Sequence, residues 1–452
     1  MSCQLMKCSP ALLLIILLSG CVGTNGVEQT SGARSLAPPL SAEESDPIAL
    51  GWQQGFPPPP ERRIEQPSSN YFSFPKLRWS VCHIRELLPT TRVSRGLGAP
   101  SAFAYALDPA IDALEFSPLD GRPPLTWRAS LFANYTDGII VLHEGRIVYE
   151  EYFGALTESG VHAAMSVTKS MSGLLAEVLV AEGQLDDSRR VDEIVPELAG
   201  SAFGDATVRQ VMDMTTALRF SEDYSDSNAE IWQYNTAASP LPRPESETGP
   251  RGYYEYLATV QKNGVHGEAF GYKTVNTDVL AWVLARTTGK SLTELLSDRI
   301  WSRIGAEQDA YFTVDGLGTP FAGGGMSAGL RDMARLGQLV LDRGRFGGEQ
   351  VLPETAIAQL SAGGDPTAFA KAGYPWLDGG SYQSMWWFFH DDHQAFAARG
   401  VHGQTIYVDP TARMVIVRFA SYPSAKNAEI DPTSLPAYRA LGRYLLGKSS
   451  AR

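Results

Sequence analysis

Ser166-Val167-Thr168-Lys169 opens a segment whose apolar residues recur at helical spacing: Met171, Leu174, Leu175, Val178 and Leu179. If a helix begins near Ser166, residues three apart lie one turn apart on the same face, which puts the Lys169 amine beside the Ser166 hydroxyl. The positive end of the helix dipole and burial both disfavour an ammonium, so Lys169 could act as a neutral base for a serine nucleophile. The alternative is an ordinary N-cap serine.

The same spacing occurs a second time, at Ser73-Phe74-Pro75-Lys76. A proline and flanking aromatic residues argue against a helix there, so the two side chains need not meet. A serine three residues before a lysine is therefore a weak signal until other motifs join it.

Two hairpins are predicted on either side of the helical region. Residues 138–142 and 147–149 flank a turn that contains Gly145, and residues 405–408 and 414–417 flank a turn at Asp409-Pro410. Amphipathic helical patterns dominate between them. We therefore expect an α/β fold in which both chain ends build an antiparallel sheet flanked by helices, with a mainly helical lobe inserted between them.

Two further motifs carry polar groups suited to acyl transfer. Tyr272 precedes a helical run, and a tyrosine held between a serine and a lysine can relay a proton from the nucleophile to the leaving group. Residues 398–404 are rich in small side chains at the start of the last hairpin. Backbone there can approach a substrate closely, so an N–H group could complete an oxyanion hole with that of Ser166.

Together these motifs resemble the serine β-lactamase and penicillin-binding protein superfamily. The resemblance is closest to its class C-like branch, which holds aminohexanoate-dimer (nylon oligomer) hydrolases and related carboxylesterases. It runs from about residue 71 to the C-terminus. The stretches that carry it are residues 165–170, Glu222-Asp223-Tyr224, residues 276–282, Trp386-Trp387 and Val401-His402-Gly403-Gln404.

The resemblance implies a serine hydrolase that needs no metal or cofactor. Ser166 would be the acylated nucleophile, Lys169 its base and Tyr272 the group that protonates the leaving atom. Val401 would donate the second oxyanion N–H, and His402 follows it in the same substrate-binding motif.

The resemblance also implies substrate contacts and contains departures. Tyr224 would contact the leaving nitrogen or oxygen, and Trp387 would close over the substrate. Asn235 stands where efficient nylon-dimer hydrolases place a carboxylate for the substrate amine, and Gly323 occupies a second position that tunes activity. Ala398 replaces the lysine with which β-lactamases bind the β-lactam carboxylate. These departures predict a small-molecule ester, rather than aminohexanoate dimer or a β-lactam, as the preferred substrate, although small amides remain open.

The first residues predict export. Lys7 precedes an apolar run at residues 11–18, which is too short to span a bilayer, and the segment closes with Leu18-Ser19-Gly20-Cys21. This pattern resembles a bacterial lipoprotein signal peptide at residues 1–20, with Cys21 lipidated as the new N-terminus. We therefore expect a periplasmic protein anchored in a membrane, the outer one by preference. A plain signal peptide is the alternative.

Residues 21–70 are rich in Pro and Ser and predict a tether, which leaves residues 71–452 as the hydrolase domain with a core at 130–450. Cys82 would be the one cysteine of the folded domain, so no internal disulfide is expected. The 452 residues carry a net charge of −12, which disfavours a nucleic-acid partner. We expect a monomer or a homodimer.

Three other readings of the sequence stay open. Gly325-Met326-Ser327-Ala328-Gly329 matches the nucleophile elbow of α/β-hydrolases, with Asp391 and His402 following in the right order, although no buried strand precedes it. His390-Asp391-Asp392-His393 is the one histidine cluster and would suit a metallohydrolase, but its charged neighbours favour a solvated loop. A catalytically silent, cell-wall-binding lipoprotein would keep the fold without the chemistry.

Overall fold

The computed structural model describes residues 38–66, 70–224, 226–243, 246 and 248–450. The predicted signal peptide and Cys21 lie outside the described residues.

The larger sheet has the order β14 (Ser381–Gln383), β15 (Trp386–Phe388), β16 (Phe396–Gly400), β17 (Gln404–Asp409), β18 (Met414–Ala420), β5 (Thr136–His143), β6 (Arg146–Tyr152) and β2 (Ala104–Tyr105). A smaller sheet has the order β1 (Thr90–Val93), β10 (Ala310–Thr313), β11 (Met326–Ala328) and β7 (His162–Ala163).

Three two-stranded sheets complete the strands: β3 (Glu115–Phe116) with β4 (Leu125–Thr126), β8 (Leu218–Arg219) with β9 (Gln261–Lys262), and β12 (Arg345–Phe346) with β13 (Glu349–Gln350). The α-helices are α1 (Leu77–Ser80), α2 (Ile84–Leu87), α3 (Trp127–Ala133), α4 (Val167–Ala181), α5 (Val208–Met212), α6 (Glu230–Ala237), α7 (Gly252–Leu257), α8 (Val275–Thr288), α9 (Leu292–Leu296), α10 (Leu330–Leu341), α11 (Glu354–Ser361), α12 (Pro366–Ala370) and α13 (Asp431–Ser450).

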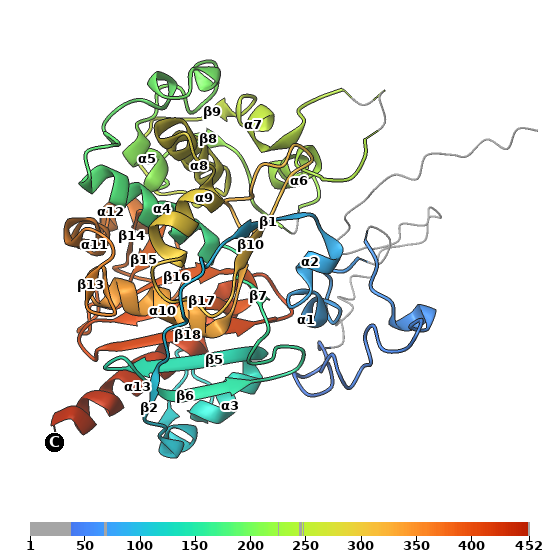
Figure 1. The fold of residues 1–452 in the computed structure, drawn as a ribbon, viewed down its shortest axis with the longest axis vertical. Helices are drawn as coiled ribbons and strands as arrows, with labels where there is room; N and C mark the ends of the chain where they lie inside the picture. The colour runs from blue at the N-terminus through green and yellow to red at the C-terminus, as the bar shows by residue number, and fades with distance from the viewer. Residues whose placement is uncertain (1–37, 67–69, 225, 244–245, 247, 451–452) are drawn as a thin grey trace, which may run out of the picture.

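Both predicted hairpins lie at the centre of the larger sheet. Glu144 and Gly145 have positive φ angles of 50° and 74°, which is the geometry of a tight hairpin turn between β5 and β6. The last strand, β18, pairs antiparallel with β5, so the two ends of the chain meet in one sheet (Figure 1). The expected α/β architecture is confirmed.

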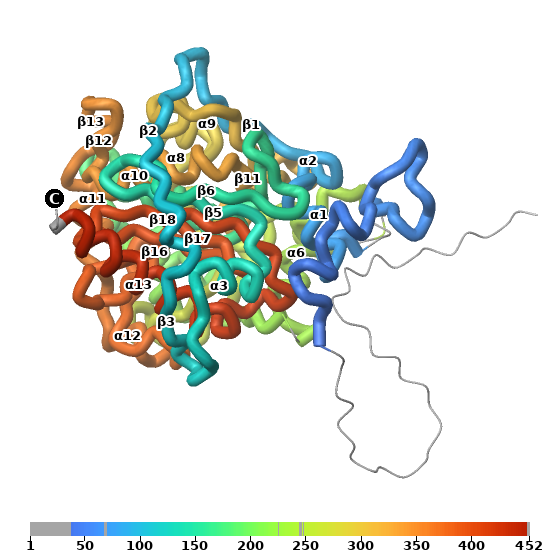
Figure 2. The backbone as a smooth tube through the Cα atoms, turned by 90° about the horizontal axis from the view of Figure 1, so that it is seen from below, coloured from blue at the N-terminus to red at the C-terminus, as the bar shows by residue number. Residues whose placement is uncertain are grey.

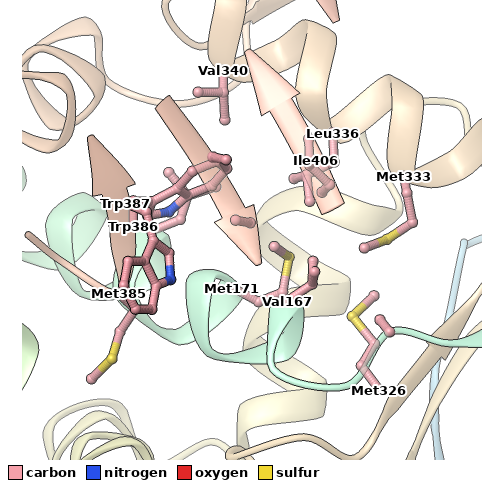
Figure 3. Close-up of a cluster of buried hydrophobic side chains, with 14 of the residues drawn as sticks. Val167, Met171, Met326, Met333, Leu336, Val340, Met385, Trp386, Trp387 and Ile406 are labelled. Carbon is pink, nitrogen blue, oxygen red and sulfur yellow. The ribbon is translucent and has the colours of Figure 1, made fainter. Parts of the chain in front are cut away.

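Helices cover both faces of this sheet. In Figure 1, α13 and α3 lie below the strands, and the helical lobe that contains α4 to α9 lies above them. Helix α10 packs on β5, β17 and β18. Its Met333, Leu336 and Val340 recur every three or four residues and face Ile406 of β17 across the core (Figure 3). Val167 of α4 lies in the same apolar cluster, so the start of that helix is held by the core.

Part of the expected tether lies against the domain. The buried guanidinium of Arg78 donates to the Ala42 carbonyl and, over 3.0 Å, to Ser45 Oγ, while its other side pairs with Asp137. Ile64 is buried as well. A buried arginine needs several acceptors, and the segment near residues 42–45 supplies two of them. The structure thus differs from a tether that stays free of the domain through residue 70 (Figure 2).

Within the described ranges, no helix is both long enough and apolar enough to span a membrane.

Candidate active site

Ser166 stands immediately before α4, at the point where the chain leaves the smaller sheet. Met165 adopts a left-handed conformation with φ of 48°, which is unusual for a side chain of its size and marks a constrained turn. Lys169 follows one helical turn later, and its Nζ donates to Ser166 Oγ over 3.0 Å. The structure therefore brings together the serine and lysine that the spacing predicted.

Lys169 is enclosed by protein and is only 1% exposed. Its amine also donates to the carbonyl of Gly323 and lies 5.1 Å from the centre of the Tyr272 ring. Burial lowers the pKa of Lys169 to about 8, and the carboxylates of Glu222 and Asp278 oppose that shift. A lysine with this pKa is partly neutral near pH 8, which a general base requires.

Tyr272 lies beside both Ser166 and Lys169, two residues before the N-cap of α8. Its hydroxyl shares a hydrogen bond with Ser166, and burial raises the pKa of Tyr272 well above its usual value. Trp387 stacks on its ring at 5.4 Å with an interplanar angle of 30°. A protonated, tightly held tyrosine between the serine and the lysine can pass a proton without rearranging.

The end of β16 approaches the backbone at Ser166. A Cβ atom on Gly400 would lie 3.0 Å from Ser166 N and 2.9 Å from the Ala164 carbonyl, so only glycine allows this approach. Val401 follows directly, as the predicted second oxyanion donor. His402 is buried with φ of 62°, and its Nδ1 contacts the Tyr422 carbonyl at 2.7 Å. Burial lowers the pKa of His402 to about 4, so its ring is neutral at physiological pH.

Two carboxylates beside Lys169, half-buried Glu222 and buried Asp278, were not predicted from the sequence as parts of the site. Glu222 accepts a hydrogen bond from the Thr274 N–H, which lies in the loop that carries Tyr272. Asp278, in the first turn of α8, accepts one from the Ala322 N–H over 2.9 Å. An acid amid apolar helix residues was the available signal, since Val275, Val279 and Leu280 surround Asp278 in sequence and all are buried.

The remaining predicted residues differ in how close they come to this centre. Tyr224 is 37% exposed and its ring lies 6.0 Å from that of Trp232. Asn235 is half-buried on α6, next to Tyr234, whose hydroxyl approaches Asp278. Ala398 is buried within β16. The structure gives no direct contact between Asn235 and Ser166, so its place in the substrate site stays a prediction.

The close packing around Gly323 leaves no room for a side chain. A Cβ atom there would lie 2.2 Å from the Thr274 side chain and 2.6 Å from the Phe321 ring, and the Gly323 carbonyl accepts from Lys169. Any larger residue would have to displace the loop that holds the lysine. A tuning role for this position is consistent with that geometry.

The rival triad does not assemble. Ser327 lies within β11, paired with Tyr311 and Ala163, and its side chain is 1% exposed. Asp391 pairs with Arg439 at 3.2 Å, and His402 contacts a backbone carbonyl instead. The elbow reading is therefore wrong, because its serine is inside a paired strand rather than on an exposed turn.

The histidine cluster is also divided between separate partners. His390 Nε2 contacts Ser381 Oγ at 2.7 Å, whereas His393 Nδ1 contacts Asp409 Oδ2 at 2.5 Å. Among the residues that the structure describes, no three potential metal ligands gather in one place. The second Ser-x-x-Lys pattern is equally split: Ser73 Oγ donates to the Asn70 carbonyl, while Lys76 lies 6.0 Å from the Trp52 ring centre.

Comparisons with known proteins agree with this geometry. Residues 129–436 match the β-lactamase family. The 6-aminohexanoate-dimer hydrolase of Paenarthrobacter ureafaciens is 36% identical over 354 residues, which cover 77% of this chain and 86% of that protein. A solved structure described as "Putative 6-aminohexanoate-dimer hydrolase from Bacillus anthracis" aligns with a TM-score of 0.75 and 32% identity, covering 83% of this chain and 96% of that one. A family VIII carboxylesterase shares the fold at a TM-score of 0.51 and 16% identity, covering 75% and 99%.

Proposed function

The chain belongs to the β-lactamase family, and from this membership we propose that it is a serine hydrolase that forms an acyl-enzyme on Ser166. Lys169 is its base and Tyr272 its proton relay. The observation that carries the proposal is the 3.0 Å contact from Lys169 Nζ to Ser166 Oγ in a buried setting.

The reaction then follows from where the protons go. Ser166 Oγ attacks the acyl carbon while Lys169 takes the hydroxyl proton. The carbonyl oxygen gains negative charge, which the N–H groups of Ser166 and Val401 stabilise by donating hydrogen bonds to it. Tyr272 gives its proton to the leaving atom and regains one from Lys169. Water, activated by the same pair, then cleaves the ester bond to Ser166 and releases the acid.

Carboxylic esters are the substrate class that this arrangement favours. An ester leaving group needs less help from a proton donor than an amine does, so Ser166, Lys169 and Tyr272 suffice for it. The two amide-type reactions need recognition that this chain lacks: Asn235 offers no charge to a free amine, and Ala398 offers none to a β-lactam carboxylate.

We expect p-nitrophenyl acetate to be hydrolysed with a higher kcat/KM than either nitrocefin or aminohexanoate dimer. Asn235→Asp should raise dimer hydrolysis by about tenfold or more, because a charge-assisted hydrogen bond contributes about 1.5–3 kcal/mol. The ester rate should change little. Steady-state kinetics of both proteins on the three substrates measure this.

Asn228→Asp is the matched control, because it adds the same charge to the exposed segment just before α6. That variant should leave dimer hydrolysis unchanged. The substrate proposal would be wrong if wild-type enzyme turned over nitrocefin or the dimer faster than the ester.

Cys21 is proposed as the lipidated N-terminus that holds the enzyme on the periplasmic face of a membrane. The support is the short apolar run that ends in Leu18-Ser19-Gly20-Cys21. Cys21→Ser should move the protein from the membrane pellet to the soluble fraction with its kcat/KM unchanged. Cys82→Ser, at the cysteine of the folded domain, should stay in the pellet. Mass spectrometry of wild-type protein cleaved elsewhere and free of lipid would contradict the anchor.

A further inference from the structure

Asp278 is connected to the nucleophile through three hydrogen bonds and the short backbone stretch Ala322-Gly323. Its carboxylate accepts from the N–H group of Ala322 over 2.9 Å, and Gly323 is the next residue along the chain. The Gly323 carbonyl accepts from the Lys169 amine, which in turn donates to Ser166 Oγ. Asp278 is thus linked to Ser166 indirectly, with no contact between the two side chains.

The loop in the middle of this series is rich in glycine, and its own backbone hydrogen bonds run from Gly324 and Gly325 to the Phe321 carbonyl. Residues 323–325 are three consecutive glycines, which restrict the backbone less than any other residue. Phe321 fixes one end by stacking on Tyr253 at 5.0 Å, and β11 begins at the other end. Between these ends, the carboxylate of Asp278 is a buried side-chain acceptor that binds the Ala322 N–H, one residue before Gly323.

We propose that Asp278 is a positioning residue for the catalytic lysine: it fixes the Ala322-Gly323 backbone so that the Gly323 carbonyl aims the Lys169 amine at Ser166, and its charge holds a proton on that amine. The inference rests on the proposed function, since it assigns a task to Asp278 only if Lys169 is the base. Nothing in the sequence motifs assigns such a role to Asp278.

The charged and titratable groups around Lys169 and Asp278 determine in which direction Asp278 shifts the pKa of the lysine. Lys169 faces Glu222, Asp278 and the Tyr272 ring, while Asp278 also faces Tyr234, Tyr253 and Tyr254. Burial raises the pKa of Asp278 to about 7, so this carboxylate is largely ionised at pH 8, where Lys169 titrates. Removing its charge should therefore let the lysine lose its proton at lower pH.

The test is the pH dependence of kcat/KM for p-nitrophenyl acetate in Asp278 variants. Wild-type activity should rise with pH through about 8 as Lys169 becomes neutral. Asp278→Asn keeps an acceptor for the loop but removes the charge, so the rise should move to lower pH by about one unit. Asp278→Ala removes the acceptor as well, and kcat should fall about 100-fold with little change in KM, because a misplaced base acts mainly on the chemical step.

Asp332 supplies a matched control from the same protein. It is a buried acid in the first turn of α10 that accepts from the N–H groups of Glu307 and Gln308, at 2.7 and 3.1 Å, and it lies outside this series. Asp332→Asn should lower the melting temperature without moving the pH at which activity rises. A purely structural role for Asp278 would make the two Asn variants behave alike.

Two further measurements separate the possible failures. If Asp278→Asn does not fold, Asp278→Glu keeps the charge but displaces it, and should retain the wild-type pH profile with a lower kcat. An unchanged pH profile and kcat in the folded variants, with the wild-type serine still labelled by a phosphonate at Ser166, would overturn the role of Asp278 alone. Absence of that label from wild-type Ser166 would instead overturn the proposed function.

Discussion

Ser166→Ala is expected to lower kcat for p-nitrophenyl acetate by about 10,000-fold or more, because no other group can form the acyl-enzyme. Lys169→Ala should lower kcat to a similar residual value, because a serine without its base attacks the acyl carbon nearly as slowly as if it were absent. The double variant should be no slower than either single variant. Members of one catalytic unit act jointly, so their losses do not multiply.

Two serines elsewhere in the chain serve as controls for this result. Ser73 shares the Ser-x-x-Lys spacing but donates to the Asn70 carbonyl, and Ser327 is buried within β11. Ser73→Ala and Ser327→Ala should each keep near wild-type kcat. A double variant much slower than both single variants would mean that Ser166 and Lys169 act independently, contrary to the proposed unit.

Tyr272→Phe is expected to produce the second largest loss. Phenylalanine keeps the stacking on Trp387 and the contact with the Lys169 amine, but removes the hydroxyl that bonds Ser166. Loss of a positioned proton donor typically costs about 100- to 10,000-fold. The loss should be larger for a simple alkyl acetate than for p-nitrophenyl acetate, because the alkoxide needs a proton to leave and the nitrophenolate does not.

Tyr382→Phe is the control for this substitution. Tyr382 is buried in the same aromatic group, 6.1 Å from the Tyr272 ring, and its hydroxyl contacts Met385 instead of Ser166. It should keep wild-type rates on both esters. Equal losses on the two esters in Tyr272→Phe would contradict the relay, because a group that only shapes the pocket has no reason to distinguish the leaving groups.

The local patterns predicted the framework of the fold. Short apolar runs rich in β-branched residues, around Gly145 and around Asp409-Pro410, define β5, β6, β17 and β18, and helical spacing after Ser166 defines α4. These signals succeed because each element shows its buried face within its own sequence. Since the two hairpins pair with each other, their positions at both ends of the helical region were enough to infer the sheet.

Features that depend on distant contacts were not visible. Residues near 42–45 have the composition of a tether, yet Arg78 and Asp137 draw them onto the domain. Glu222 lies in a polar stretch, where a charged side chain usually faces water, and Asp278 occupies a helix turn that often carries exposed acids. Only the folded arrangement reveals that both carboxylates lie beside Lys169, Asp278 buried and Glu222 half-buried.

The elbow motif at Ser327 shows that a motif can match in sequence although the folded structure does not support it. Its spacing was right, but a nucleophile elbow needs an exposed turn, and tertiary pairing with Tyr311 and Ala163 places this serine inside a sheet. A short motif fixes the order of residues and leaves their surroundings open.

The most direct measurement is to treat the wild-type enzyme with a fluorophosphonate that labels activated serines, and to locate the adduct by peptide mass spectrometry. We expect a single adduct on Ser166, formed rapidly in wild type, and far more slowly in Lys169→Ala. An adduct on Ser327 or Ser73, or wild-type protein that is not labelled while remaining folded, would contradict Ser166 as the nucleophile.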